Sequence, residues 1–447
     1  MSKARHPSVS PPHVGVIGAG AAGMTAALRA AESGARVTLL NAHPKIGLKI
    51  LMSGGTRCNV THREVNERDF NGGSRAFVAR VLRAFDVPGT LAWFAQLGVE
   101  LKLEPTGKYF PMTDDAQTVL DALLAANERA GVRIESGARA VRIRREVLGG
   151  SPARLHVGIQ DARFSAEFGP AVARVGEEHW SVPDREPDRW LEADRLVLAT
   201  GGLSFPRTGS DGVGYALALA LGHTLVSPVP ALTPLTADDP WCRSLQGLAC
   251  EAELRLYEGS KRLVSTRGSL LFAHFGYTGP VALDLSRHWH RAARDAAPLV
   301  VASFTPGESE ESLRRSMIEA AEREPRVSVR AFLSRSMPER LAAEVCREIG
   351  VDGGSMLGQL PRADRRTLVE RVLRRPMSVT GTLGYEKAEV TAGGVRLSEV
   401  NPSTLESRLV PGLYLCGEIL DVEGRLGGFN FQWAWSSGTV AGCSASA

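Results

Sequence analysis

Short apolar runs alternate with amphipathic segments near the start of the chain, and this pattern predicts a parallel sheet flanked by helices. Residues 14–17 form a uniformly apolar run, which is typical of a strand that is buried on both faces of a sheet. The alanine-rich segment 21–33 predicts a helix that ends at Gly34, and residues 35–40 predict the next strand. The order strand, helix, strand indicates a βαβ unit.

The rest of the chain extends this pattern and then interrupts it. Apolar periodicity predicts helices over 74–85, 88–97 and 115–130, and strands over 132–134, 140–143, 195–199 and 412–416. Residues 45–62 have neither period, which favours a long functional loop. We predict an α/β protein with a discontinuous Rossmann-type domain over 1–222 and 389–447, which has an antiparallel β excursion near 140–190. A mainly β domain with some helices is inserted over 223–388 and serves as a lid or substrate domain.

The turn after the first strand has the glycine spacing GxGxxG. Gly18 allows the sharp turn, Gly20 lets a diphosphate approach the main chain, and Gly23 lets the helix pack closely on the strand. The helix N-terminus then faces the phosphates with unpaired N–H groups. This context favours a dinucleotide site over a structural turn. Asn41 stands where such units usually have an acid, so it either holds a ribose hydroxyl without a charge or is a turn residue before Pro44.

A second glycine motif lies near the C-terminus. The strand over 412–416 ends at Gly417 and Glu418, a position that suits a carboxylate accepting hydrogen bonds from the ribityl hydroxyls of a flavin. Gly427 and Gly428 precede a helix over 429–441, whose first N–H groups suit a flavin carbonyl. A nicotinamide enzyme does not need this second, distant contact set. The two motifs together therefore favour FAD over NAD as the resident cofactor.

Composition narrows the classes of function. The 447 residues are 43% hydrophobic and 23% charged, and no apolar run is long enough to span a membrane, so we expect a cytoplasmic protein without a membrane partner. The net charge is only +4, and no basic stripe is evident, so no nucleic-acid partner is expected. The six cysteines have no CxxC spacing, which argues against a metal site or a dithiol centre. Oligomeric state is left open.

Five long segments carry a family resemblance. They read KILMSGGTRCNVTH, ATGGLSFPRTGSDGVGYALA, LLFAHFGYTGP, VTAGGVRLSEVNPSTLES and LYLCGEILDVEGRLGGFNFQWAWSSG. Together they resemble the BaiN-like, aminoacetone-oxidase-like family of NAD(P)/FAD-dependent oxidoreductases, over about residues 14 to 442. The resemblance implies a discontinuous FAD domain and an inserted, largely β domain that begins after the ATGG helix and ends before TAGGV.

The same resemblance implies which residues contact FAD. The diphosphate, adenosine and adenine side would be contacted by Gly18, Gly20, Ala22, Gly23, Asn41, Lys49, Ile50 and the backbone of Val141. The loop beside the flavin and the wall of the site would be formed by Ser53, Gly54, Gly55, Arg57, Cys58, Asn59, Thr200 and Gly201. The ribityl chain and the ring system would be contacted by Gly417, Glu418, Gly428, Asn430 and Phe431. Lys49 and Ile50 are implied to lie near adenine, and Thr56 replaces a third glycine of the family loop.

Several side chains have two interpretations. Cys58 is either a thiol close to the flavin or an inert packed cysteine, and Arg57 either stabilises the reduced flavin or forms an ion pair that fastens its loop. His274 lies at a strand-to-turn junction, where it is either a proton donor or hydrogen-bonded to the turn backbone. Trp433 and Trp435 are expected to divide between the core and a domain interface. No catalytic acid or base is assigned.

These features predict a flavoenzyme that binds FAD non-covalently and reduces an unsaturated or carbonyl small molecule. No second GxGxxG follows a strand, so NAD(P)H is expected only as a transient reductant. The absence of a dedicated NAD(P)H motif also favours the alternative, an amine oxidase that passes electrons to dioxygen. A flavin-holding sensor or RNA-associated protein and a plain NAD-dependent dehydrogenase are the alternatives from other classes.

Overall fold

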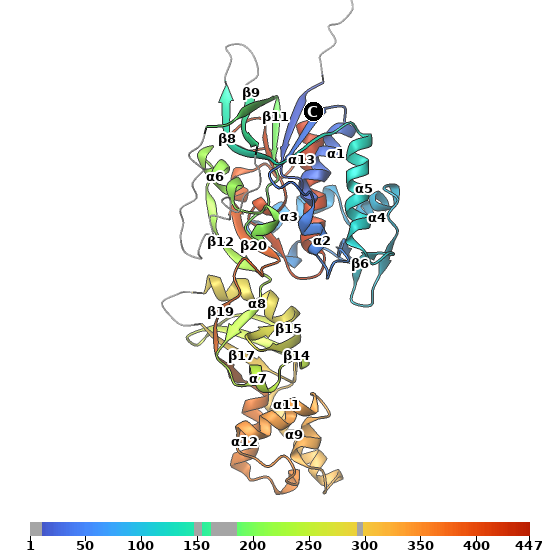
Figure 1. Cartoon of the computed structure of the whole chain (residues 1–447). Helices are drawn as coiled ribbons and strands as arrows, with labels where there is room; N and C mark the ends of the chain where they lie inside the picture. The colour runs from blue at the N-terminus through green and yellow to red at the C-terminus, as the bar shows by residue number, and fades with distance from the viewer. Residues whose placement is uncertain (1–10, 147–153, 162–185, 293–297) are drawn as a thin grey trace, which may run out of the picture. The chain divides into compact units, whose positions relative to one another are not determined.

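A computed structural model describes residues 11–146, 154–161, 186–292 and 298–447 (Figure 1). The chain divides into two compact units, one formed by Met1–Val229 with Glu389–Ala447 and the other by Pro230–Ala388. The first unit is discontinuous in sequence. The change of unit comes at Val229, later than the predicted residue 222, because strand β12 (Leu225–Ala231) pairs with strand β20 (Val390–Val395) of the returning chain.

A five-stranded parallel sheet forms the centre of the first unit. Its order is β21 (Leu413–Leu415), β11 (Arg195–Leu198), β1 (His13–Ile17), β2 (Arg36–Asn41) and β7 (Arg133–Ser136). All four neighbouring pairs are parallel. Their carboxyl ends therefore meet at one edge, where ligands bind in open α/β sheets. Gly18, Asn41, Thr200 and Gly417 all lie at this edge. The predicted α/β class is confirmed, and the C-terminal strand joins the first sheet as predicted.

Two helices from opposite ends of the chain pack together in this unit, α1 (Ala21–Glu32) and α13 (Phe429–Ala445) (Figure 1). Their backbones approach closely at two glycines of α13. A Cβ on Gly438 would lie 2.6 Å from the carbonyl oxygen of Ala22, and one on Gly442 would lie 2.3 Å from that of Ala26. The N-terminal and C-terminal motifs are thereby held in one body.

The two tryptophans of α13 both lie in the core of the first unit. Trp433 is 2% exposed and donates to the carbonyl of Gly417 at 3.1 Å, and Trp435 is 0% exposed and donates to that of Val60 at 2.9 Å. The expected division between core and domain interface is therefore wrong. Helix α13 is buried on nearly all sides, so it has no polar face that would leave one indole outside.

The remaining elements of the first unit surround this core. The helices are α2 (Leu48–Met52), α3 (Arg75–Ala84), α4 (Val87–Gln96), α5 (Ala116–Arg129) and α6 (Val213–Ala220). The small sheets contain β3 (Thr61–His62), β6 (Lys108–Pro111), β5 (Leu101–Leu103), and β22 (Val422–Gly424) with β4 (Phe70–Gly72). Strands β8 (Ala138–Glu146), β9 (Arg154–Asp161) and β10 (Arg189–Ala193) form an antiparallel sheet. This sheet is the predicted β excursion, whose residues 147–153 and 162–185 lie outside the described residues. The segment 45–62, predicted as a loop, contains α2 and β3.

The second unit is built on a seven-stranded antiparallel sheet with helices. The strand order is β18 (Arg375–Met377), β17 (Leu299–Ser303), β14 (Ala249–Glu258), β15 (Lys261–Ala273), β16 (Gly276–Thr278), β13 (Leu235–Ala237) and β19 (Val379–Thr382). The helices are α7 (Trp241–Ser244), α8 (Pro280–Arg291), α9 (Glu310–Arg323), α10 (Val329–Leu333), α11 (Glu339–Glu348) and α12 (Arg362–Leu373). This unit has the predicted mixture of a β sheet with some helices.

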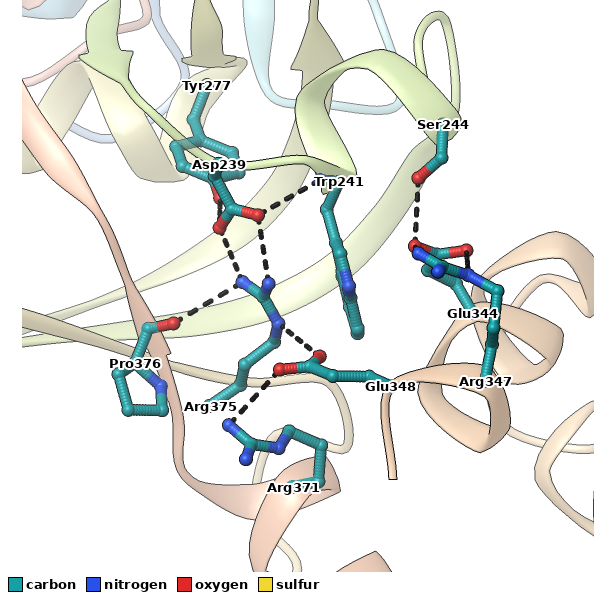
Figure 2. A network of polar contacts seen from close by, with 10 residues as sticks. All are labelled: Asp239, Trp241, Ser244, Tyr277, Glu344, Arg347, Glu348, Arg371, Arg375 and Pro376. Atoms are coloured by element: carbon teal, nitrogen blue, oxygen red, sulfur yellow. Dashed lines mark hydrogen bonds and ion pairs between the residues drawn. The ribbon is translucent and has the colours of Figure 1, made fainter. Parts of the chain in front are cut away.

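A buried ion pair joins the sheet of the second unit to its helices (Figure 2). Arg375 donates from Nη1 to Oδ2 of Asp239 at 2.7 Å and from Nη2 to Oδ1 at 2.9 Å, and its Nε donates to Glu348 of α11 at 3.0 Å. Tyr277 also donates to Asp239. The side chains of Arg375 and Asp239 are 6% and 2% exposed, and the guanidinium lies 3.7 Å from the ring centre of Trp241. The ion pair of Arg375 and Asp239 therefore links four elements, which are β16, β18, α7 and α11.

Candidate functional site

At the three glycine positions after β1, a side chain would meet different surroundings. Gly18 has φ +107°, and a Cβ there would lie 2.4 Å from the carbonyl oxygen of Ala199. A Cβ on Gly23 would lie 1.8 Å from the carbonyl oxygen of Gly18. A Cβ on Gly20 would meet nothing within 4 Å, and Gly20 caps α1 without any side-chain hydrogen bond. The main chain is therefore open at the helix N-terminus, where a diphosphate fits.

Asn41 is tied into its own turn. Its Nδ2 donates to the carbonyl oxygens of His43 at 2.6 Å and Lys45 at 3.2 Å, and its Oδ1 accepts from the N–H of Ala19 at 3.3 Å. These hydrogen bonds support the interpretation of Asn41 as a turn residue. The Oδ1 atom keeps one acceptor position, so a ribose contact stays a prediction.

The loop after α2 has an unusual backbone. Gly54, Gly55, Thr56 and Cys58 all have φ between +57° and +69°. A Cβ on Gly55 would meet nothing within 4 Å, so this part of the loop faces open space. A left-handed conformation is unfavourable for a β-branched residue. Thr56, which departs from the family pattern, therefore carries backbone strain.

Replacing Thr56 with glycine is expected to stabilise the protein by about 1 kcal/mol, because glycine adopts positive φ without steric cost. Thermal or urea unfolding of the protein without added flavin measures the change. Thr367 is an exposed threonine inside α12, and Thr367→Gly is expected to destabilise the protein by about 0.3 kcal/mol, because glycine is a somewhat poorer helix former than threonine. A Thr56→Gly variant that is less stable than the parent would contradict the strain.

Cys58 and Asn59 follow in the same loop and are both buried. Cys58 is 0% exposed, and burial raises the pKa of its thiol to about 12, so the thiol is protonated and inert at neutral pH. Asn59 is 8% exposed, and its Oδ1 has no hydrogen-bond partner among the described residues. That atom lies 2.7 Å from where a Cβ of Gly428 would stand. The N-terminal loop therefore contacts the C-terminal glycine motif directly, and the inert interpretation of Cys58 is favoured.

Thiol titration of the folded protein at pH 8 is expected to detect one cysteine. Cys443 is exposed, whereas the other five cysteines are buried. All six should react after denaturation in guanidinium, and Cys443→Ser should remove the fast reaction. Rapid labelling of Cys58 in the folded Cys443→Ser variant would contradict the buried, protonated thiol.

The guanidinium of Arg57 is held by its neighbours. Its Nη1 lies 2.7 Å from Glu104 and 3.4 Å from Asp114, and the group stacks 4.0 Å from the ring centre of Phe110. The hydrogen bond to Glu104 raises the pKa of Arg57. These contacts correspond to the ion pair that fastens the loop. A role for this charge toward a flavin stays a prediction.

Glu418 lies in a network that draws on four distant segments. Its Oε2 accepts from Lys49 Nζ at 2.6 Å, and its Oε1 accepts from Ser204 Oγ at 2.8 Å and from the N–H of Thr391 at 2.9 Å. Lys49 also donates to Ser204 at 2.6 Å. Ser204 and Thr391 were not singled out from the sequence as site residues, although both lie in the family segments. Because Lys49 touches Glu418, the two residues belong to the same region of the site.

The start of α13 uses its side chains for internal contacts. Asn430 accepts from the N–H of Gly424 at 2.8 Å and donates to its carbonyl at 2.9 Å. Phe431 stacks on Trp435 with ring centres 5.5 Å apart. Gly428 has φ +92° and caps the helix without a side-chain hydrogen bond. The side-chain amide of Asn430 is committed to Gly424, so its backbone is the part that a flavin ring can use.

Val141 and Thr200 are two further residues that are predicted to contact FAD. Val141 is the extra residue of a bulge in β8, because Ala140 pairs with Ile159 and Arg142 pairs with the adjacent Gly158. Its backbone therefore has no partner in the β8–β9 ladder, as a backbone contact to adenine requires. Thr200 has a buried hydroxyl without a hydrogen-bond partner among the described residues.

His274 belongs to the second unit. It is exposed in the turn between β15 and β16, and its ring lies 5.1 Å from that of Phe275. Within the described part of the chain, no hydrogen bond joins its ring to the turn backbone. The backbone-bonded interpretation is therefore not supported, and the role of proton donor stays a prediction.

Among the described residues, no group of three or more His, Cys, Asp and Glu side chains is placed to hold a metal ion. No helix among these residues combines the length and apolar character needed to cross a membrane.

The residues at the carboxyl edge of the parallel sheet fit a flavin dinucleotide. The open main chain at Gly20 and Gly55 leaves room for a ligand. The buried Oδ1 of Asn59 and the buried hydroxyl of Thr200 have no hydrogen-bond partner among the described residues, so both can pair with polar groups of a bound ligand. Glu418 adds a carboxylate at the end of β21. A flavin dinucleotide has phosphate, hydroxyl and ring polar groups that can occupy the open main chain and form hydrogen bonds with these side chains.

Comparison with known proteins gives one family and several full-length relatives. The family model described as HI0933-like protein Rossmann domain matches residues 12–168 and 155–444. The 3-dehydro-bile acid delta(4,6)-reductase of Clostridium scindens is 32% identical over 432 residues, which cover 96% of this chain and 98% of that protein. The ribosomal RNA dihydrouridine synthase of Escherichia coli is 32% identical over 94% of this chain and 95% of that protein. The protein of the same name from Haemophilus influenzae is 30% identical over the same shares.

Proposed function

This chain belongs to the HI0933-like Rossmann-domain family and is an FAD-dependent oxidoreductase, and we propose that it reduces a carbon–carbon double bond conjugated to a carbonyl group. The observation that carries the proposal is the shared chemistry of its relatives. A 3-dehydro-bile acid has a 3-keto group, with which delta(4,6) double bonds are conjugated. Dihydrouridine differs from uridine by two hydrogens across a double bond that is conjugated to a ring carbonyl. Both products arise by adding a hydride and a proton to such a system.

The residues of this chain would bind the cofactor, orient it and keep it apart from water. The α1 N-terminus at Gly20 would bind the diphosphate, Glu418 would accept from a ribityl hydroxyl, and the bulge at Val141 would meet adenine. When bound, FAD supplies the hydride transfer. The donor of the proton is not assigned to a residue of this chain.

NAD(P)H is proposed as the reductant that transfers a hydride to the cofactor. The test is anaerobic mixing of the FAD-loaded protein with NADH or NADPH, followed by a 3-keto-4-ene steroid as acceptor. We expect the absorbance of the oxidised flavin, at about 450 nm, to bleach with one nucleotide and to return with the acceptor. Failure of both nucleotides to bleach the band would reject the reductase. Bleaching by an amine, with recovery in air and release of hydrogen peroxide, would favour the amine oxidase.

A uridine in ribosomal RNA is the second candidate substrate. The relative from Escherichia coli has the same identity to this chain, 32%, as the bile acid reductase. Helix α12 also presents Arg362 and Arg366 one turn apart, both exposed and without an ion pair to any described residue. These features weigh against the expectation of no nucleic-acid partner. Dihydrouridine measured by mass spectrometry, after incubation of unmodified ribosomal RNA with the reduced enzyme, distinguishes the two substrates.

A further inference from the structure

Lys49, Ser204, Thr391 and Glu418 form a hydrogen-bonded cluster. Lys49 and Glu418 are its partly exposed members, and Ser204 and Thr391 are its buried members. Ser204, which contacts both residues, is 0% exposed, and Thr391 is also 0% exposed. The side chains of Lys49 and Glu418 are 27% and 18% exposed. The cluster therefore presents two charged groups toward solvent on a fixed, buried base.

The hydrogen-bonding capacity of these two groups is almost used up. A carboxylate has about four acceptor positions, and Glu418 Oε1 fills two of them with Ser204 Oγ and the N–H of Thr391. Its Oε2 has one donor, Lys49 Nζ, so one acceptor position is left. An ammonium has three donors, and Lys49 uses two of them, on Glu418 and Ser204. One acceptor and one donor therefore remain, on atoms 2.6 Å apart.

A hydroxyl group is the ligand that fits this remainder. It donates one hydrogen bond and accepts others, so it satisfies Glu418 and Lys49 together. A carbonyl or a phosphate oxygen would leave Glu418 without a donor and would bring a second acceptor against its charge.

We propose that Lys49 and Glu418 together bind one hydroxyl of the ribityl chain of FAD, with Glu418 accepting its proton and Lys49 donating to its oxygen. Ser204 and Thr391 are positioning residues that fix the carboxylate in the protein before the cofactor arrives. The proposal rests on the FAD site proposed above. It moves Lys49 from the adenine side, which the family resemblance implies, to the ribityl chain.

ADP distinguishes the two positions of Lys49, because it carries the adenosine and the diphosphate of FAD but no ribityl chain. Binding of FAD and of ADP to the flavin-free protein is measured by calorimetry for the parent, Lys49→Met and Glu418→Gln. We expect each variant to bind FAD about 10- to 100-fold more weakly, the range for hydrogen bonds to charged groups. Binding of ADP should change less than about threefold, a margin for long-range charge effects. The double variant should be little worse than the poorer single variant, since the two groups act on one hydroxyl.

Three results would overturn the proposal. Equal weakening of FAD and ADP by Lys49→Met would place Lys49 on the adenosine or diphosphate. Unchanged FAD binding in Lys49→Met would remove it from the site. Fully additive losses in the double variant would separate the two groups. If the parent binds ADP but no FAD, the proposed function fails instead, and absence of reductase activity with intact FAD binding would leave this inference standing.

Controls guard against misfolding and against loss of charge alone. Lys49→Arg keeps the charge and should recover part of the FAD affinity, and Ser204→Ala should weaken FAD more than ADP by loosening Glu418. Lys261→Met removes an exposed lysine from the second unit and should leave both affinities unchanged. Circular dichroism and the unfolding temperature of each flavin-free variant report whether the fold is intact. A misfolded Lys49→Met is recognised there, and Lys49→Arg with Ser204→Ala then decides the proposal by the ratio of FAD to ADP binding.

Discussion

Replacing Gly20 with valine is expected to abolish FAD binding while the protein stays folded. A Cβ at this position would meet nothing within 4 Å, so the side chain has room in the protein itself. That room lies at the uncapped N-terminus of α1, where the main chain must touch the diphosphate. We expect at least about 100-fold weaker binding, equivalent to about 2.7 kcal/mol. Flavin fluorescence quenching measures the affinity, and circular dichroism and thermal unfolding report the fold.

Two other glycines serve as references for this prediction. Gly358→Val adds the same side chain at an exposed position of the second unit, where the nearest atom is 3.7 Å away, and should leave FAD affinity unchanged. Gly23→Val should instead destabilise the first unit, because a Cβ there would stand 1.8 Å from the carbonyl oxygen of Gly18. A Gly20→Val protein that binds FAD as tightly as the parent would show that the diphosphate lies elsewhere.

Replacing Asp239 with alanine is expected to destabilise the second unit by about 3–5 kcal/mol, the usual cost of leaving one partner of a buried ion pair alone. The change would leave Arg375 charged and 6% exposed, with only Glu348 as a carboxylate partner. Urea unfolding followed by circular dichroism measures the loss. Glu251→Ala, which removes an exposed carboxylate from the same unit, should change stability by less than about 0.5 kcal/mol.

The same pair predicts a dependence on pH. Burial alone would raise the pKa of Asp239, but hydrogen bonds from Arg375 and Tyr277 and the charge of Arg375 outweigh it and hold that pKa below its usual value. A carboxyl with a lowered pKa in the folded state contributes stability above its unfolded pKa of about 3.9. That contribution is lost as the pH falls through the folded pKa. Stability of the second unit should therefore decline below about pH 4. An Asp239→Ala variant whose free energy of unfolding lies within about 1 kcal/mol of the parent's would contradict the role of the pair.

Local patterns were sufficient to predict the first strand, helix and strand, because each has its own periodicity and its own glycines. Gly23 is constrained by Gly18, five residues before it, and Gly20 by a standard ligand contact, whereas Gly18 lies against Ala199 of a distant segment. Short elements could not be found in this way. Helix α2 has only five residues, too few to show a period. The pairing of β12 with β20, which accompanies the change of unit at Val229, leaves no local signal in the sequence.

Contacts between distant segments were the part of the site that the sequence did not reveal. Lys49 and Glu418 are separated by 369 positions, and nothing in either segment indicates that the two side chains meet. The apolar helix α13 likewise gave no sign that both of its tryptophans would be buried in one core, because it has no polar face to set its orientation. Glu418 itself was recognised because it follows a strand and a glycine, which is a local feature.

The most direct test of the account is the flavin content of the purified protein, because every proposal depends on one FAD bound between the two ends of the chain. Heat-denatured protein should release FAD in a ratio of about one per chain, and protein purified without flavin should recover its absorbance when FAD is added. Protein that is colourless and binds no added FAD would contradict the account.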